Sequence, residues 1–474
     1  MEFANYITEN SKNNLQQLVN STNKSLHNNK ILRKSFSNYK KFFEETNTKI
    51  FLRKVDMDTK ANLKKKLFDF YKDLIDDKVN QNYDFIRDLE SVNDVYEIYV
   101  SELEMFKFYV YYDDIKYISQ IIHIFNIFTK YIFSVPEKKR KFFMRLFGHS
   151  NELQNKLNNI DKYYFNIYLF PNKLKRILAG ISFTLDHLRI YKKTNTAFTT
   201  SGVTSFEMIL TKKEEFSKLF LHELIHLYKL DGTHSIETGK LDNIRNMMPF
   251  MDYNGERECV AELMSNIYNC MNLCLISSDK SHDSYDQLID LINIEKEYSI
   301  YLVAKILKYF NIKPNELFNY VKQKVQLVSP INLYCILRSI LFFKLDDFLH
   351  TDNMANSDIL EINDNIYSEL VSWVDSASIV DSEYMLRLEY YYNIIQIKNN
   401  LAVLYISLDI DFDMVEFKNI HIEYAFNEMS HMDLFKKQFK EILLNKKNMV
   451  QYGGSKNFYY KYLKYKLKYL QIKK

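Results

Sequence analysis

Glycine and proline are scarce in this sequence. Only 8 Gly and 5 Pro occur among 474 residues, and the first proline is Pro136. These two residues mark tight turns and interrupt helices. Their scarcity therefore excludes a fold built on many tight turns, and it predicts a chain that is mainly helical with a small β-sheet.

Cysteine and long apolar runs are scarce as well. There are four cysteines, and Cys270 and Cys274 lack obvious partners for a metal site, so we expect reduced, buried thiols in a cytosolic compartment. No apolar run follows Met1, which argues against a cleaved secretion signal. The most apolar stretch, residues 109–133, is interrupted by Asp113, Asp114 and Lys116. It predicts a buried helix and no transmembrane segment.

Length and composition bound the domain organisation. A chain of 474 residues can bury a large core and should form two or three domains. We expect a helical N-terminal domain over residues 1–155, which carries no chemical motif. A second domain over residues 156–448 should contain the sheet, beginning near residues 163–170, and a tail over 449–474 should follow.

The most informative stretch is His222-Glu223-Leu224-Ile225-His226. Residues four apart share one face of a helix, so both imidazoles can bind one metal ion. Glu223, next to the first histidine, can then accept a proton from a metal-bound water. The pattern predicts a Zn²⁺ site with hydrolytic chemistry.

The flanking sequence predicts that the motif lies on a helix. Residues 203–210 alternate imperfectly with period two, as in a half-buried strand. Thr211 to Glu214 match a capping box, and apolar residues then recur at helical spacing. Asp231-Gly232 should end the helix, which gives a helix of about 19 residues entered directly from a strand.

A catalytic zinc site needs a third protein ligand and an open position for water. Glu258 and Glu262 lie four apart on a second expected helix. In one register Glu258 binds zinc, and Glu262 accepts a hydrogen bond from a ligand imidazole. In the other register Glu262 binds zinc and Asn266 takes the supporting role. We prefer the first because a carboxylate raises the basicity of an imidazole more than an amide does.

At these residues the chain resembles the gluzincin metallopeptidases, zincins that combine HExxH with a downstream glutamate. Glu258-Cys-Val-Ala-Glu262 is similar to the ExxAE element of secreted bacterial zincin toxins, in which the first glutamate is the ligand. The alternative alignment resembles the thermolysin-type element with Asn266 in place of an aspartate. The resemblance implies a zincin-like, two-lobed catalytic domain, with residues 270–448 as its helical second lobe.

The end of the chain suggests the kind of organism from which the protein comes. Residues 452–474 resemble the basic, tyrosine-rich tails of mimivirus-like giant-virus proteins, and residues 212–223 are similar to a stretch of uncharacterised zincin-like proteins from such viruses. Residues 453–474 contain lysines but no acidic residue, so the tail could bind an acidic or virion partner. We expect no nucleic-acid partner. The implied location is the host cytoplasm or the virion.

Together these features predict a zinc-dependent endopeptidase that acts on a protein or peptide. Glu223 would be the general base, and an oxyanion at the scissile carbonyl would need a further donor. Tyr334 and Arg338, four apart on one expected helix, are candidates for that donor. The strand over 203–210 could pair with an extended substrate, as edge strands can.

The alternative is a catalytically inactive zincin-fold scaffold or virion protein, which would use the fold and its basic tail for binding. The intact Glu223 speaks against this alternative, because a purely structural zinc site does not need it.

Overall fold

The structure is a computed structural model. It describes residues 2–16, 18, 25–72, 89–101, 103, 105–147, 165–171, 197–201, 206–211, 213–232, 255–278, 284–309, 311–318, 330–356, 358–363, 366–379, 382–395 and 406–424. All of these belong to one compact unit, formed by residues 1–149 and 163–426. The tail predicted over 449–474 lies outside the described residues.

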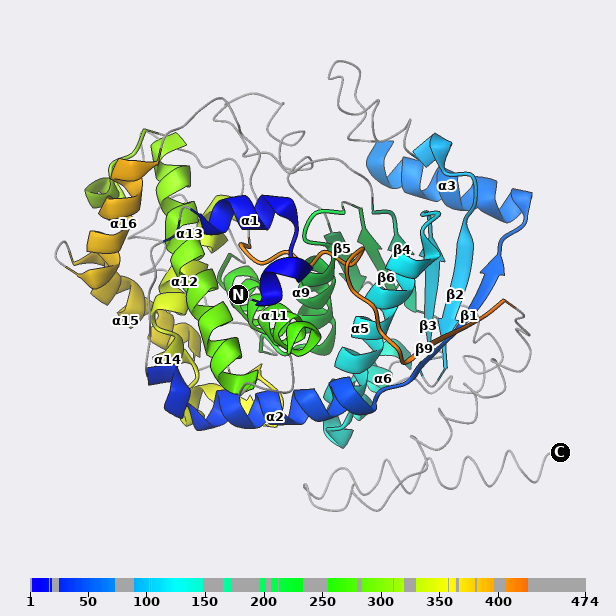
Figure 1. The fold of residues 1–474 in the computed structure, drawn as a ribbon, viewed down its shortest axis with the longest axis horizontal. Coiled ribbons are helices and arrows are strands. Elements are labelled where there is room, and N and C mark those ends of the chain that lie inside the picture. Colours follow the sequence, from blue (N-terminus) through cyan, green and yellow to red (C-terminus); the bar gives the residue numbers. More distant parts are fainter. Residues whose placement is uncertain are drawn as a thin grey trace. The chain divides into compact units, whose positions relative to one another are not determined.

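Helices dominate the described residues, as the scarcity of glycine and proline predicts (Figure 1). The helices before the HExxH segment are α1 (Glu9–Leu15), α2 (Lys30–Glu45), α3 (Met57–Lys72), α5 (Ile115–Phe133) and α6 (Pro136–Phe147). The later ones are α9 (Phe216–Tyr228), α11 (Gly255–Ser277), α12 (Ser284–Tyr309), α13 (Pro330–Phe343), α14 (Leu345–Phe348), α15 (Ile366–Ser378) and α16 (Glu383–Ile394). Helix α5 confirms the buried helix predicted within residues 109–133.

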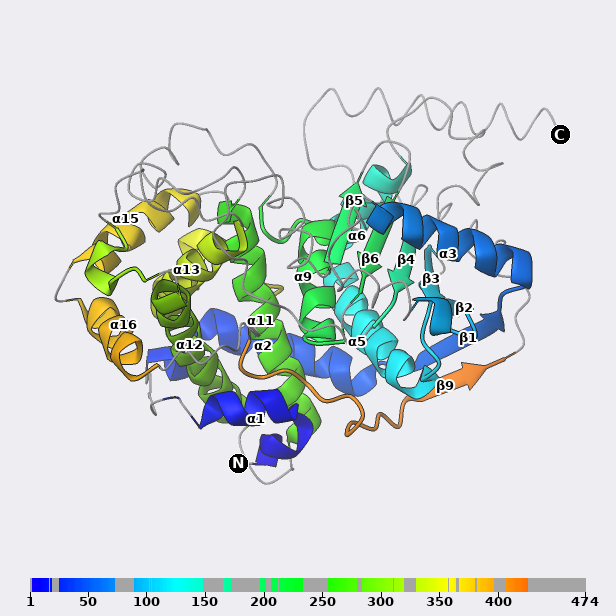
Figure 2. The ribbon, with the colours of Figure 1, turned by 90° about the horizontal axis from the view of Figure 1, so that it is seen from above.

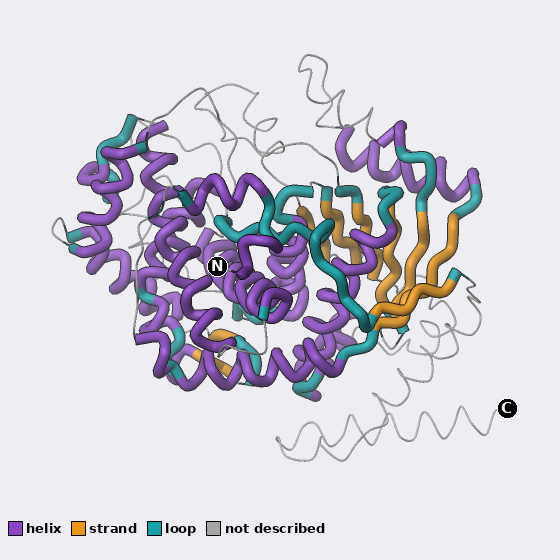
Figure 3. The backbone as a smooth tube through the Cα atoms, in the orientation of Figure 1, coloured by secondary structure: helices purple, strands orange, loops and turns teal. Residues whose placement is uncertain are grey.

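A mixed seven-stranded sheet forms the other part of this unit (Figure 3). Its order is β5 (Ala197–Ser201), β6 (Phe206–Leu210), β4 (Phe165–Leu169), β3 (Phe106–Val110), β2 (Tyr96–Val100), β1 (Thr48–Lys54) and β9 (Ile420–Glu423). Strands β3, β4 and β6 run parallel, whereas β5 pairs antiparallel with β6 at one end of the sheet. A separate pair is formed by β7 (Met354–Asn356) and β8 (Glu361–Ile362).

The predicted domain boundary at residue 155 does not separate two folding units. Strands β1, β2 and β3 precede it, and β3 pairs with β4 through the register Phe108↔Ile167. The prediction that residues 1–155 form a separate helical domain is therefore wrong. The physical reason is that five residues such as Phe106–Val110 are too short to distinguish a strand from part of a helix, and their pairing with β4 depends on a segment far along the chain.

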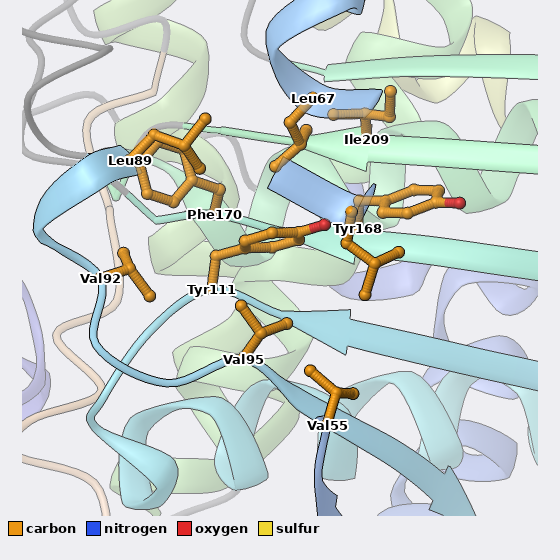
Figure 4. Packing of buried hydrophobic residues seen from close by; sticks show 10 residues of the cluster. Val55, Leu67, Leu89, Val92, Val95, Tyr111, Tyr168, Phe170 and Ile209 are labelled. Atoms are coloured by element: carbon orange, nitrogen blue, oxygen red, sulfur yellow. The ribbon is translucent and has the colours of Figure 1, made fainter. Parts of the chain in front are cut away.

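Both faces of the sheet are covered by helices. On one face Phe125 of α5 packs edge-on against Phe106 and Phe108, with ring centroids 4.9 and 5.1 Å apart, and stacks on Phe220 of α9 at 5.4 Å. On the opposite face a second apolar cluster includes Leu67 of α3, together with Tyr168 and Ile209 from the strands (Figure 4). The sheet thus supports α9, the helix that carries the HExxH motif, through packing of Phe220 against Phe108 and Phe125.

Helix α11 lies at the centre of the helical group, where it packs against α9, α12 and α13 (Figure 2). By length and composition its segment 257–277 could cross a membrane, but 89% of the tested window is buried inside the protein. Helices α5 and α6 meet that test only as a pair bent by 111°. The four cysteines are buried, as predicted, and none is in a disulfide.

Candidate metal centre

Helix α9 carries His222, Glu223 and His226, and it begins later than the sequence predicts. Its first residue is Phe216, and the preceding Glu215 has a left-handed backbone (φ 56°) without a side-chain capping bond. The predicted capping box at residues 211–214 is therefore wrong, and the helix has 13 residues. Glu215 is instead turned inward, where its carboxylate accepts the backbone N–H of Ile406.

The end of α9 is a tight turn just beyond the second histidine. Lys229 adopts a left-handed backbone (φ 52°), and the N–H groups of Lys229 and Leu230 donate to the carbonyls of His226 and Ile225. This is the bonding pattern of a Schellman motif, which reverses the chain after a helix. The residue that follows, Asp231, is thereby brought back toward His226.

Helix α11 supplies the acids that face α9. The Nε2 atoms of His222 and His226 lie 3.1 Å apart. A carboxylate oxygen of Glu258 lies 3.1 Å from the first Nε2 and 3.5 Å from the second. These three atoms form a triangle in a group of side chains that could hold a metal ion.

The size of this triangle fits a zinc ion. Zinc binds imidazole nitrogen and carboxylate oxygen at about 2.0–2.2 Å in a tetrahedral arrangement. Two ligand atoms at such distances lie about 3.3–3.5 Å apart, because a tetrahedron edge is about 1.6 times its centre-to-corner length. The separation of 3.5 Å lies within that range and the two of 3.1 Å are slightly shorter, and the donor set of two imidazoles and one carboxylate is typical of catalytic zinc.

Glu262 lies on the other side of His222. One of its carboxylate oxygens is 3.0 Å from Nδ1 of His222, while the other contacts Nζ of Lys218 and lies 3.1 Å from a guanidinium nitrogen of Arg338. All of these side chains are buried. These positions of Glu258, near both Nε2 atoms, and of Glu262, near Nδ1, are those that the first register would require. The amide of Asn266, the supporting group in the other register, makes no hydrogen bond with a described residue.

The imidazole of His226 has a carboxylate partner that the sequence analysis missed. Its Nδ1 atom lies 2.8 Å from Asp231, a buried residue of the turn after α9. Sequence reasoning used Asp231 only as a helix stop. The sequence shows only that Asp231 follows the second histidine by five residues. That spacing brings the carboxylate to the imidazole only if the helix ends in a turn that reverses the chain.

The carboxylates oppose the effect of burial on the two histidines. Burial lowers the pKa of His222, but Glu258 and Glu262 outweigh it and raise that pKa above its ordinary value. Burial likewise disfavours the charged form of His226, yet Glu258 and Asp231 raise its pKa well above 6.5. Burial raises the pKa of Glu258, but the two histidines outweigh it and hold that pKa well below its ordinary value. The site therefore attracts positive charge of the kind that a bound cation would supply.

The structure places the remaining predicted site residues in different positions relative to the candidate metal site. Glu223 lies on α9 beside His222, with 8% of its surface exposed. Tyr334 lies on α13, but its side chain is outside the described residues. Arg338 is fully buried and bonds Glu262 behind His222, on the side away from the Nε2 atoms. That position does not fit the oxyanion donor that the sequence predicts.

The strand predicted to bind substrate is also placed differently. Strand β6 is paired on both sides, with β4 and with β5, so it offers no free edge to a peptide. The prediction that residues 203–210 pair with substrate is therefore wrong. Among the described strands, β5 occupies the end of the sheet on this side, and it contacts α9.

Comparison with known proteins shows a similarity to a giant-virus protein. The chain is 28% identical over 241 residues to an uncharacterized protein of Acanthamoeba polyphaga mimivirus, and the match covers 46% of this chain. It spans 59% of the length of that relative. The similarity supports the resemblance to giant-virus proteins that the tail suggested. No protein-family model and no solved structure matches the chain.

Proposed function

We propose that the protein is a zinc-dependent endopeptidase with a zincin-like, two-lobed catalytic domain. The observation that carries the proposal is the triangle of His222 Nε2, His226 Nε2 and the Glu258 carboxylate oxygen, whose edges of 3.1–3.5 Å are close to those of tetrahedral zinc coordination. Glu223 supports a catalytic rather than a purely structural site, because HExxH chemistry uses that carboxylate as a base.

In this proposal each described side chain has a defined task. His222, His226 and Glu258 would hold the ion, which when bound would act as a Lewis acid toward water and the substrate carbonyl. Glu223 takes a proton from the attacking water and returns it to the leaving amine. Glu262, 3.0 Å from Nδ1 of His222, would favour the orientation in which Nε2 is available to the metal.

The substrate would approach along the sheet. Among the described strands, β5 is the last one on the side of the sheet that contacts α9. An extended peptide could add to such an edge by main-chain hydrogen bonds. We therefore propose β5, in place of β6, as the strand that aligns a protein or peptide substrate with the metal centre.

The proposal is tested by metal content and peptide cleavage measured on the same preparations. Wild type should bind one zinc ion per chain and cleave members of a broad peptide library. His222→Ala and Glu258→Ala should lose zinc and activity together. Glu223→Gln should retain zinc while kcat/KM falls by about 10²–10⁴-fold, because the metal ligands remain and only the base is lost.

The matched controls are His421→Ala and Glu369→Gln, which change exposed residues on β9 and α15 and should leave zinc and activity unchanged. If wild type binds zinc but cleaves no peptide, the peptidase assignment fails and a non-catalytic zincin scaffold is favoured. If wild type binds no zinc, the metal centre itself is wrong.

A further inference from the structure

We propose, on the basis of the zinc site described above, that Asp231 is the positioning residue for His226. We further propose that the turn presenting Asp231 is held in place by three elements that are remote from it in sequence. The structure thereby assigns β8 and α15 a part in building the metal centre, although neither carries a candidate ligand.

The side-chain contacts of Asp231 point to this role. Its Oδ2 atom lies 2.8 Å from Nδ1 of His226 and 3.8 Å from Nε of Arg257. Its Oδ1 atom has no hydrogen-bond partner among the described residues. Asp231 is 2% exposed, and burying a carboxylate is costly unless it is paired. Its principal partner is thus a candidate zinc ligand.

The carboxylate of Asp231 is not needed to close the turn in which it lies. An aspartate in a turn usually accepts a nearby backbone N–H and so stabilises the turn. The described turn is instead closed by backbone bonds, from Lys229 N–H to His226 and from Leu230 N–H to Ile225. The carboxylate of Asp231 is therefore available for His226.

Three consecutive carbonyls of the turn are each bound by a different element. The carbonyl of Leu230 accepts the N–H of Ile362 in β8 at 3.0 Å. The carbonyl of Asp231 accepts the hydroxyl of Tyr367 in α15 at 2.7 Å, and that of Gly232 accepts the guanidinium of Arg257 in α11 at 2.9 Å. Such a set of bonds fixes both the position and the orientation of the turn.

This geometry has a chemical consequence for His226. A carboxylate that accepts the Nδ1 proton keeps the imidazole in the tautomer whose Nε2 lone pair is free for a metal. It also raises the basicity of that nitrogen and restrains rotation of the ring. Glu262 lies 3.0 Å from Nδ1 of His222, so a buried carboxylate lies beside Nδ1 of each histidine ligand.

The first test measures zinc affinity by competition with a chelator. Asp231→Asn should weaken zinc binding, since the amide is a poorer acceptor, and Asp231→Ala should weaken it further, to about 10–100-fold overall. ¹⁵N NMR of the histidines in zinc-loaded protein should show the Nδ1 proton of His226 exchanging faster in both variants. A residue that only stabilises the fold would not produce this ordered loss of affinity with a local change at one imidazole.

The second test separates the anchoring of the turn from general stability. Tyr367→Phe removes the hydroxyl that holds the carbonyl of Asp231 and should weaken zinc binding several-fold. The matched control is Tyr384→Phe, which removes an equally buried hydroxyl that bonds Ser339 at 2.7 Å. It should leave zinc affinity unchanged.

The outcomes distinguish this inference from the proposed function. If wild type binds zinc and cleaves peptide while both Asp231 variants bind zinc as tightly, the role of Asp231 is overturned and the peptidase stands. The role of Asp231 is also overturned if affinity falls only as the folded fraction falls, which thermal unfolding of the zinc-free variants measures. If wild type binds no zinc, both proposals fail.

Discussion

At the scale of single residues, the most informative side chain is Glu262, because its two oxygens have different partners. One oxygen faces Nδ1 of His222, and the other contacts Lys218 and Arg338. Burial raises the pKa of Glu262, but Lys218, His222 and Arg338 outweigh it and hold that pKa well below its ordinary value. The carboxylate therefore stays ionised, and two buried cations share one acidic partner.

This arrangement predicts unequal costs for removing its members. Glu262→Gln leaves Lys218 and Arg338 buried without their common carboxylate and should destabilise the zinc-free protein by about 3–5 kcal/mol. Arg338→Met leaves a Lys218–Glu262 pair of opposite charge and should cost clearly less. Urea unfolding of both variants measures the difference. A larger loss of stability for Arg338→Met would show that Glu262 is not the residue on which the other two charged side chains depend.

At the scale of secondary-structure elements, two buried titratable groups join helices to distant segments. In α5, Nδ1 of His123 lies 2.6 Å from the hydroxyl of Thr48 in β1, and burial lowers the pKa of His123 to about 4. In α12, Glu295 accepts the backbone N–H groups of Ser407 and Leu408, and burial raises its pKa to about 7. Each group thus titrates differently in the folded and unfolded chain.

These shifts predict opposite pH dependences. Folded His123 binds fewer protons than the unfolded chain between about pH 4 and 6.5, so its contribution to stability is lost as pH falls through that window. Folded Glu295 binds more protons between about pH 4.5 and 7, so its contribution is lost as pH rises. Each effect amounts to roughly 3 kcal/mol at most, and the two largely cancel in the wild type.

Single variants should reveal how each group changes the free energy of unfolding with pH. Relative to wild type, His123→Gln should lose stability progressively as pH rises from 4.5 to 7, because only Glu295 then responds. Glu295→Gln should lose stability as pH falls over the same range. Urea unfolding at several pH values in the presence of a chelator provides the measurement, and variants that parallel wild type at every pH would contradict the shifts.

At the scale of the whole molecule, the two ends of the described chain are built into the same unit. Strand β9 pairs with β1, and the N–H of Thr8 donates to the carbonyl of Asp409. Strand β3 pairs with β4 across the predicted boundary at residue 155. The sheet that supports α9 therefore needs residues from both sides of that boundary.

This topology predicts that residues 156–448 do not fold alone. Without β1–β3 and α5, Phe220 of α9 loses its packing against Phe125, and β4 loses a strand partner. The fragment should aggregate or unfold without cooperativity in thermal scans, whereas a chain of residues 1–448 should unfold as the full chain does. A stable, cooperatively folded 156–448 fragment would show that the predicted domain boundary is correct after all.

Sequence reasoning found the elements whose pattern is local. The helix of the HExxH motif, the following acidic helix, the apolar helix within 109–133 and the strand at 206–210 all carry a period that neighbouring residues reveal. It missed β1, β2 and β3, and it assigned residues 203–210 to a substrate-binding edge. Pairing partners and edge positions depend on contacts between distant segments, which periodicity does not encode.

For the site, the sequence by itself determined which side chains share a helix face: His222 with His226, and Glu258 with Glu262, because helical geometry alone brings residues four apart together. Only the tertiary structure decided how those faces meet. It placed Glu258 near both Nε2 atoms, Arg338 behind His222 and Asp231 against His226. Those placements arise from the packing of α9, α11 and α13 and from bonds made by β8 and α15, which join residues far apart in the chain.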